Sequence, residues 1–386
     1  MYKIISLTLL GAVITSGVQA AEWSLSGSVD PSLEYDDNIF MRDENKLGDY
    51  HARMSPTLKV VHAIENSETS LSTGYVLDRY ERSSQLDTEN PFWRIDTSYK
   101  TERSTWGLNA SYVESTSRTD AEEDTGDFET NSISTTERIS PSYSFQLTER
   151  DVLSVSASYS TKEYSTADFS NSRSRSLSTN WQHQFTERFN GGVSVSANNN
   201  KSSGLTSTID DDTYNVSLTT KYDLSEIWAI NGSVGLRQLD SEQKDLFGFT
   251  DNTSDTGSSL DLNISYKGEV DTASLGLSRS ISPSSTGGVN EQDRISLSWS
   301  RELTETLTAR ISGSFLTTTS AIDDSNDKRE NLTLSPSVNW KFSPDASLSL
   351  SYKFRQQKES DANTDASSQA VMLTLNYGWD GFRVSR

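Results

Sequence analysis

Histidine and acidic side chains are the first candidates for chemistry in this sequence, and few of them stand in suitable positions. The 386 residues contain three histidines and no cysteine. Without cysteine there is no thiol nucleophile, thiolate metal ligand or disulfide. His51 has an acid close by, Asp49, whereas His62 and His183 stand far from it in the sequence. We expect no enzyme and no catalytic residue, and His51 beside Asp49 is the one pairing that a hydrolase could use.

Acidic residues cluster in two polar stretches, residues 120–127 and 323–327, which resemble calcium loops only loosely. Neither stretch has the Asp-x-Asp-x-Asp-Gly spacing that places oxygen ligands around calcium. Acidic surface loops are usually solvated. The sequence therefore predicts no metal site and no cofactor.

A strict alternation of apolar and polar residues dominates the rest of the chain, and it is clearest in residues 331–355. Leu332, Leu334, Val338 and Trp340 share one parity there, and serine, threonine, asparagine and lysine occupy the other. Residues 346–355 repeat the pattern after a short turn. A period of two is that of a strand with one apolar and one polar face, so this segment is predicted to form a β-hairpin.

Composition indicates where such apolar faces are buried. Only 33% of the residues are hydrophobic, the mean hydropathy is -0.62 and the formal net charge is -21. This hydrophobic fraction is low for a soluble domain of this size, which must fill a core. It suits a transmembrane β-barrel, in which only the lipid-facing surface is apolar. Short turns alternate with longer polar segments, such as residues 117–130, 198–212 and 240–256. A soluble solenoid or sandwich has no need of that alternation.

We therefore predict an all-β fold, a transmembrane antiparallel up-and-down barrel of about 18 strands with both termini periplasmic. Aromatic residues flank the short turns, as in the girdle of a barrel at the lipid interface. The last strand ends near Trp379, after which the parity slips at Asp380-Gly381. Either Trp379 or Phe382 would be the terminal aromatic that the barrel assembly machinery recognises.

Residues 1–20 read as a signal peptide. Lys3 precedes an apolar run over residues 4–14, and Val18-Gln19-Ala20 is a small-x-small cleavage site. Residues 21–386 would then form the barrel domain in the cell outer membrane. No later apolar run is long enough for a helical span.

Alternation also predicts which charged residues face the lumen. Acids are few among them, so the wall is expected to be net basic and to attract an anionic solute or an acidic polymer. The alternative is that these cations pair with acids across strands. The predicted pore-lining residues are Arg53, Arg94, Arg138, Arg237, Arg294, Arg310 and Arg355, with Lys59, Lys100, Lys221, Lys267 and Lys341 nearer the periplasmic turns.

A second set of arginines has lipid-facing parity at the outer rim. They could bind lipopolysaccharide phosphates, since arginine pairs bidentately with phosphate, or could simply extend toward water. These residues are Arg79, Arg173, Arg175 and Arg279.

Two segments carry a family resemblance: Pro31-Ser-Leu-Glu-Tyr-Asp-Asp-Asn-Ile-Phe40 and Tyr377-Gly-Trp-Asp-Gly-Phe-Arg-Val-Ser-Arg386. They resemble the opening and ending of the β-barrel porin family encoded with exopolysaccharide and capsule gene clusters. The resemblance implies export of a polysaccharide across the outer membrane, with a periplasmic polysaccharide export protein as partner. The resemblance assigns a functional role to no individual residue.

Two other functions stay open on the sequence: a general diffusion porin, and a structural or surface-interaction barrel acting through its acidic loops. Outer-membrane lipid and lipopolysaccharide are expected partners, and nucleic acid is not. The solute, the oligomeric state and any plugging of the pore by loops have no readable signature.

Overall fold

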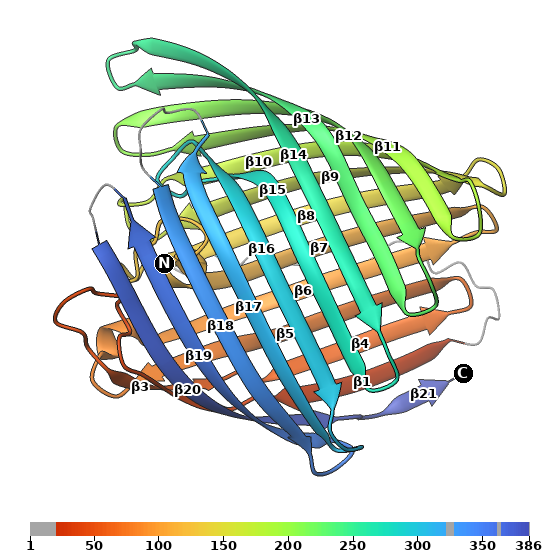
Figure 1. The fold of residues 1–386 in the computed structure, drawn as a ribbon, viewed down its shortest axis with the longest axis horizontal. Helices are drawn as coiled ribbons and strands as arrows, with labels where there is room; N and C mark the ends of the chain where they lie inside the picture. Colours follow the sequence, from red (N-terminus) through yellow and green to blue (C-terminus); the bar gives the residue numbers. More distant parts are fainter. Residues whose placement is uncertain (1–20, 322–327, 361–363, 386) are drawn as a thin grey trace.

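The computed structural model describes residues 21–321, 328–360 and 364–385. The predicted signal peptide and the acidic stretch 323–327 lie outside these residues. The described chain forms one antiparallel sheet that closes into a ring (Figure 1). None of its helices is long and apolar enough to cross a membrane.

The ring has 18 wall strands, as predicted. The first consists of β1 (Glu22–Val29) and β2 (Ser32–Asp36), interrupted at Pro31, and the second of β3 (Asp49–Met54) and β4 (Thr57–Ile64), interrupted at Pro56. Proline cannot donate to a ladder, so it breaks a strand locally. The other sixteen are β5 (Ser67–Tyr80), β6 (Thr88–Lys100), β7 (Ser104–Thr116), β8 (Ile133–Gln146), β9 (Asp151–Tyr164), β10 (Asn171–Gln184), β11 (Phe189–Ser203), β12 (Ser207–Asp223), β13 (Trp228–Asp245), β14 (Thr250–Lys267), β15 (Asp271–Pro283), β16 (Val289–Glu302), β17 (Leu307–Ser320), β18 (Lys328–Lys341), β19 (Ala346–Glu359) and β20 (Thr364–Trp379).

The barrel closes where the first wall strand pairs with the last. Val29 lies opposite Tyr377, and Leu33 lies opposite Leu373. The start of β1 and the end of β20 therefore lie at the end of the barrel that carries the short turns. Whether that end is periplasmic remains a prediction.

The residues that follow β20 confirm that the alternation shifts by one residue at Asp380-Gly381. A short strand, β21 (Arg383–Ser385), pairs with the start of β1, and the amide of Leu25 donates to the carbonyl of Phe382 at 2.9 Å. A Cβ at Gly381 would lie 2.2 Å from the Leu25 carbonyl oxygen, so a side chain does not fit there. The rings of Trp379 and Phe382 meet edge to face at 5.9 Å between centroids. Neither is singled out as the assembly signal.

The two faces of the wall differ as the alternation predicts. Large apolar side chains such as Leu177, Leu218 and Leu236 are exposed on the outside. Hydroxyls line the inside, where Ser156 and Ser178 lie 2.7 Å apart between their Oγ atoms. An apolar outer band around a polar interior is the surface pattern of a barrel in lipid.

The prediction of long loops is wrong for two segments. Residues 198–212 and 240–256 lie mostly in strands, because β11 to β14 continue well beyond the apolar band, and only residues 204–206 and 246–249 form turns. The register runs unbroken through the polar part, for example from Val216 opposite Leu236 to Ser207 opposite Asp245. A neighbouring strand satisfies the backbone groups there, so polar side chains on both faces do not end the strand.

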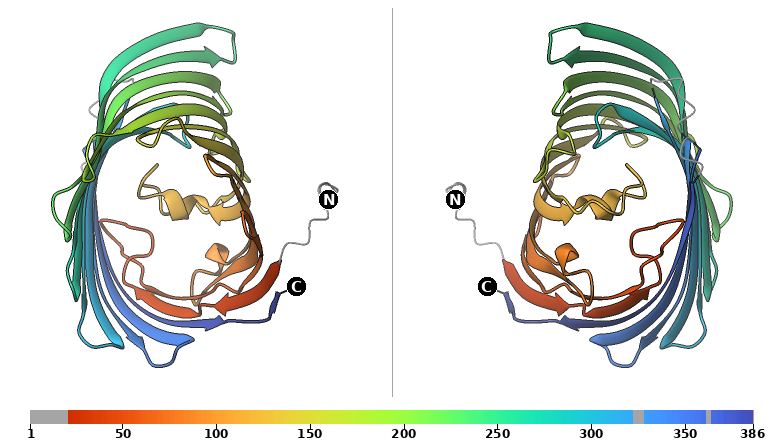
Figure 2. Two further views of the ribbon diagram at one scale, coloured as in Figure 1. Left: turned by 90° about the vertical axis from the view of Figure 1, so that its right-hand side faces the viewer. Right: turned by 90° about the vertical axis from the view of Figure 1, so that its left-hand side faces the viewer.

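The wall splits beyond the apolar band between β14 and β15. These strands pair only from Leu260 to Lys267 of β14, and residues 250–259 pair with β13 alone in the described structure. The end of the β15–β16 hairpin instead turns into the ring (Figure 2), where Ser285 accepts a hydrogen bond from the amide of Ser170 at 2.7 Å.

Replacing Leu297, which lies midway between Asp293 and Arg301 on the outward face of β16, with arginine should destabilise the barrel by about 2–4 kcal/mol, because the charge would face lipid. Urea unfolding in phospholipid vesicles measures this. The control is S298R, whose side chain faces the lumen. Equal losses in the two variants would contradict the assignment of faces.

Candidate functional site

Three connections at the end of the barrel with long loops fold into its lumen. They are residues 37–48, residues 81–87 with the 3-10 helix η1 (Ser84–Leu86), and residues 117–132 with the one-turn helix α1 (Ser117–Asp120). Viewed along the barrel, all three lie inside the ring (Figure 2). The lumen is therefore narrowed by loops, which the sequence did not reveal.

These loops pack on one another through apolar side chains. Ile39, Phe40 and Leu86 form one buried cluster. Met41 packs with Ala121 and Phe128 in a second cluster, which also contains Ala366 of β20. A small apolar core thus stands inside a polar lumen, and its burial orders loops that would otherwise be solvated.

One of the two segments with the family resemblance, residues 31–40, anchors the first loop. Asn38 is fully buried, and its Nδ2 donates to the carbonyls of Arg42 at 2.7 Å and Ser367 at 2.9 Å. Asp36 accepts from the Asn38 amide at 2.8 Å and from the Ser368 hydroxyl at 2.6 Å. Residues 31–40 therefore include side chains that fix a loop inside the lumen.

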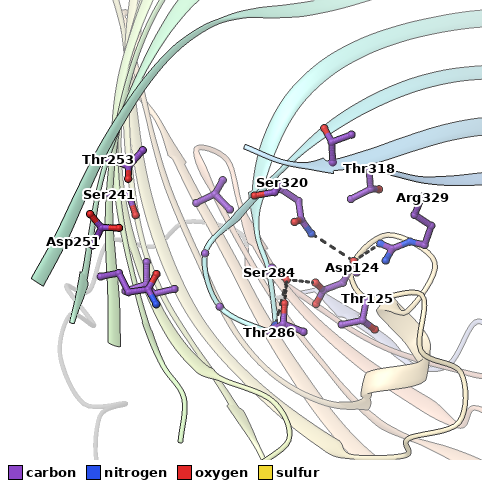
Figure 3. Close-up of a pocket in the computed structure, with 17 residues that line it drawn as sticks. Asp124, Thr125, Ser241, Asp251, Thr253, Ser284, Thr286, Thr318, Ser320 and Arg329 are labelled. Atoms are coloured by element: carbon purple, nitrogen blue, oxygen red, sulfur yellow. Dashed lines mark hydrogen bonds between the residues drawn. The ribbon is translucent and has the colours of Figure 1, made fainter. Parts of the chain in front are cut away.

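The loop 117–132 crosses the lumen and is tied to the opposite wall. The Asp124 carboxylate accepts a hydrogen bond at 3.0 Å from the hydroxyl of Ser284 (Figure 3). It accepts another, also at 3.0 Å, from the amide of Ser285. Arg294 binds the Glu123 carboxylate at 2.6 Å. Further bonds come from β18 and β19: Asn331 to the Glu122 carbonyl, Thr333 to the Glu122 carboxylate, Arg329 to the Asp124 carbonyl and Gln357 to the Gly126 carbonyl.

Asp127 stabilises the return of this loop. Burial alone would raise the pKa of its carboxyl group, but hydrogen bonds from Thr130 and from the Glu129 amide outweigh burial and hold the pKa below its usual range. The group is thus ionised at neutral pH, and it accepts from two backbone amides at 2.8 and 3.1 Å.

A charged cavity of about 260 Å³ lies in the lumen between this loop and the wall. Four cations line it: Arg53 of β3, Arg118 of α1, and Lys353 and Arg355 of β19. Glu34, Asp36, Asp78 and Glu122 line it as well. We call this cavity the constriction.

The charges of the constriction are only partly paired. Arg53 binds Asp78 at 2.7 Å, and Arg355 binds Asp36 at 2.5 Å. Arg118 instead donates to main-chain carbonyls, including that of Ile39 at 2.8 Å. Within the described residues, neither Arg118 nor Lys353 has a carboxylate within 4.0 Å, so neither charge is compensated by an ion pair in the constriction. The guanidinium of Arg118 already donates to the Ile39 and Phe128 carbonyls and lies 5.3 Å from the Phe40 ring centroid.

Of the predicted pore-lining arginines, Arg53 and Arg355 meet in the constriction and two others are paired elsewhere. Arg237 is almost fully buried and binds Asp255 at 3.0 Å and Glu291 at 2.9 Å, which links β13 to β16 across the split in the wall. Arg294 holds the loop through Glu123. The cross-strand pairing that was the alternative to an anion-attracting wall therefore accounts for Arg237.

The remaining predicted cations do not converge on one place. Arg138 and Arg310 alternate with outward-facing Ile139 and Ile311, and the guanidinium of Arg94 lies 5.7 Å from the ring centroid of Phe92. Five lysines lie in the half of the barrel that carries the short turns: Lys59, Lys100, Lys221, Lys267 and Lys341.

The predicted partner of His51 is wrong. Its Nε2 lies 2.6 Å from the Asp78 carboxylate, and its ring stacks on Tyr80. The Asp49 carboxylate instead accepts hydrogen bonds from the amides of Arg82 and Ser83. It thereby anchors the second loop, residues 81–87. His51 is thus part of the ion-paired wall of the constriction.

The four rim arginines separate into two kinds. Arg79 binds Glu89, and Arg279 forms two hydrogen bonds of 2.6 Å with Asp293, so acids already occupy both guanidinium groups. Arg173 and Arg175 are exposed on the outward face of β10 and have no ion pair among the described residues. Phosphate binding at the rim remains a prediction, and it is better suited to this second pair.

Sequence reasoning missed Arg118 and Lys353. Lys353 shares its parity with Arg355, so the alternation did contain that signal. Arg118 stands in a stretch that reads as a solvated acidic loop, and no local pattern shows that this loop enters the lumen.

No protein-family model matches the chain. No curated protein matches it either. Solved structures do resemble it. The unliganded ferric citrate transporter FecA superposes with a TM-score of 0.54 at 13% identity over 86% of this chain, which spans 60% of FecA. The likeness shows the fold alone.

Two further structures match over nearly their whole length. OccAB4 of Acinetobacter baumannii gives a TM-score of 0.52 at 11% identity, over 94% of this chain and 98% of its own. OccK2 (OpdF) of Pseudomonas aeruginosa, solved in complex with glucuronate, gives 0.50 at 9% identity, over 93% and 98%. The chain thus has the fold of outer-membrane β-barrels.

Replacing Asp124 with alanine should loosen the loop that crosses the lumen. The variant loses hydrogen bonds worth about 1 kcal/mol each, so the tip should leave the β15–β16 hairpin more often. Single-channel recordings in planar bilayers should show a larger mean conductance. The control is E187A, at a short turn at the other end of the barrel. Identical conductance in D124A and the native protein would contradict the role of this contact.

Proposed function

We propose that this protein is an outer-membrane channel for small acidic saccharides, which are recognised at the constriction. The observation that carries the proposal is the convergence of four cations and four carboxylates on one cavity inside a lumen narrowed by loops. The apolar outer band supports a location in the outer membrane.

The mixture of charges favours an acidic sugar over a simple anion. A cation binds a sugar carboxylate through charge-assisted hydrogen bonds, and Lys353 and Arg118 are the cavity's two cations without a carboxylate partner among the described residues. Carboxylates accept hydrogen bonds from sugar hydroxyls, and Glu34 and Glu122 line the same cavity. The hydroxyl-rich wall, with pairs such as Ser274 and Ser298, offers further weak partners along the lumen.

A structural neighbour agrees with this class of solute. OccK2, which shares the fold, was solved in complex with glucuronate, a sugar acid. At 9% identity this likeness assigns no residue. It does make glucuronate a suitable first probe.

Replacing Arg118 with glutamine should weaken block of the channel by glucuronate about tenfold, because one charge-assisted contact is lost. K353Q should behave similarly, and both should reduce the preference for anions in reversal potentials. The control is R173Q, on the outer face of the barrel. Unchanged block in both R118Q and K353Q would exclude the constriction as the recognition site.

Export of an exopolysaccharide is the second candidate, and the resemblance at residues 31–40 and 377–386 favours it. A polymer needs a continuous path, so the loop 117–132 would have to leave the lumen during transport. A general diffusion porin would need neither this movement nor recognition of a carboxylate.

A deletion strain separates these functions. If the protein exports polysaccharide, deletion should abolish the secreted polymer and leave it in the periplasm. If it is a channel for small acidic sugars, secretion should be normal and growth on glucuronate at limiting concentration should slow. Growth that equals the parent's on every small solute, with secretion lost, would favour export.

A further inference from the structure

The part of β14 beyond the apolar band is an open strand edge. Residues 250–259 pair with β13 on one side, and in the described chain no strand pairs with their other side. Residues 250–254 are exposed. An unpaired edge presents alternating N–H and C=O groups that another strand can bind, and natural proteins usually protect it with charged side chains, proline or a cover. This edge contains neither lysine nor proline, and its two charged residues, Asp251 and Asp255, are both acidic.

A rigid apolar tip stands at the start of this edge. Leu246, Phe247 and Phe249 are 72%, 86% and 75% exposed at the turn between β13 and β14, which projects beyond the other hairpins (Figure 1). The Asp245 carboxylate accepts from the amides of Phe247 and Phe249 at 2.9 and 2.8 Å, and Gly248 takes the left-handed conformation with φ +83°. The turn is therefore held in one shape while it presents its aromatic rings to solvent.

The outward face beside the edge is acidic. Asp210 lies opposite Glu242, and Asp212 lies opposite Asp240, so like charges face each other directly on β12 and β13. Such pairs destabilise a sheet. Lys201 and Lys244 compensate Asp210 and Glu242, respectively. Asp212 and Asp240 have only amide and hydroxyl partners among the described residues, and all four acids line a groove that Asn252 and Ser254 of β14 border.

The geometry points to a docking surface for a basic, extended segment of another protein, which adds to β14 as a further strand. Its backbone would pair with residues 250–259. Its lysines or arginines would reach over Asn252 and Ser254 to the acidic row on β13, which lies two strand spacings, about 10 Å, away. An apolar residue at its end would pack on Phe247 and Phe249. Charge complementarity selects this occupant, because an acidic segment or a second copy of this acidic chain would be repelled.

Three synthetic peptides, each as long as the free edge, test the proposal on the full barrel in lipid nanodiscs. One alternates lysine and valine, one alternates glutamate and valine, and one is the lysine peptide N-methylated at every second residue. The lysine peptide should bind, weaken with salt, and slow amide hydrogen exchange in residues 250–259. The other two should bind at least about tenfold more weakly, because one lacks the charge and the other cannot complete the ladder.

A double variant, F247S and F249S, should weaken the lysine peptide about tenfold, and F382S at the other end of the barrel should not. Equal binding of the N-methylated peptide, or protection outside residues 250–259, would overturn strand addition. Concentration-dependent dimerisation through the same residues, seen by analytical ultracentrifugation, would overturn the proposed occupant. Insertion of the tip into phosphatidylcholine vesicles without peptide binding would do the same.

Discussion

Everything in this structure depends on the pairing of backbone groups around a closed ring. A strand in lipid has no water for its N–H and C=O groups, so each wall strand must have a partner on both sides through the apolar band. The first wall strand meets this requirement by pairing with β20, even though Pro31 and Pro56 interrupt the ladder there. Beyond the band the requirement lapses, and it is there that β14 and β15 part.

The wall and the contents of the lumen follow different physical rules. The wall obeys a period of two, so its interior is polar and mostly hydroxylic. The loops bring their own apolar core into that interior through Phe40, Met41 and Phe128. Ion pairs join the two, with Arg294 on the wall holding Glu123 on the loop. The constriction lies between the regular wall and the irregular loop 117–132. Its cations come from both: Arg53, Lys353 and Arg355 from the wall, and Arg118 from the loop.

This division also explains what the sequence could predict. Alternation is local, so it was sufficient for the 18 wall strands, the parity slip before Phe382 and the inward face of Arg53 and Arg355. It could not place Arg118, because the contacts of its loop are distant in sequence, as between Asp124 and Ser284. The polar ends of β11 to β14 lack the alternation that predicts strands, because strands paired in water need no apolar face. The pairing of Arg237 with Glu291 depends on the inward turn of β16, which has no local signature.

The contacts of the loop 117–132 with the wall also bear on the order of assembly. Its partners lie in the β15–β16 hairpin, β18 and β19, which follow it in the chain by well over a hundred residues. Contacts of such long range form late, after the strands that carry them are in place. The pairing of β1 and β2 with β20, which closes the ring, joins residues still further apart in the sequence. By the same argument, the loop can be tied to its wall strands before the ring closes, so that the barrel is completed around its contents.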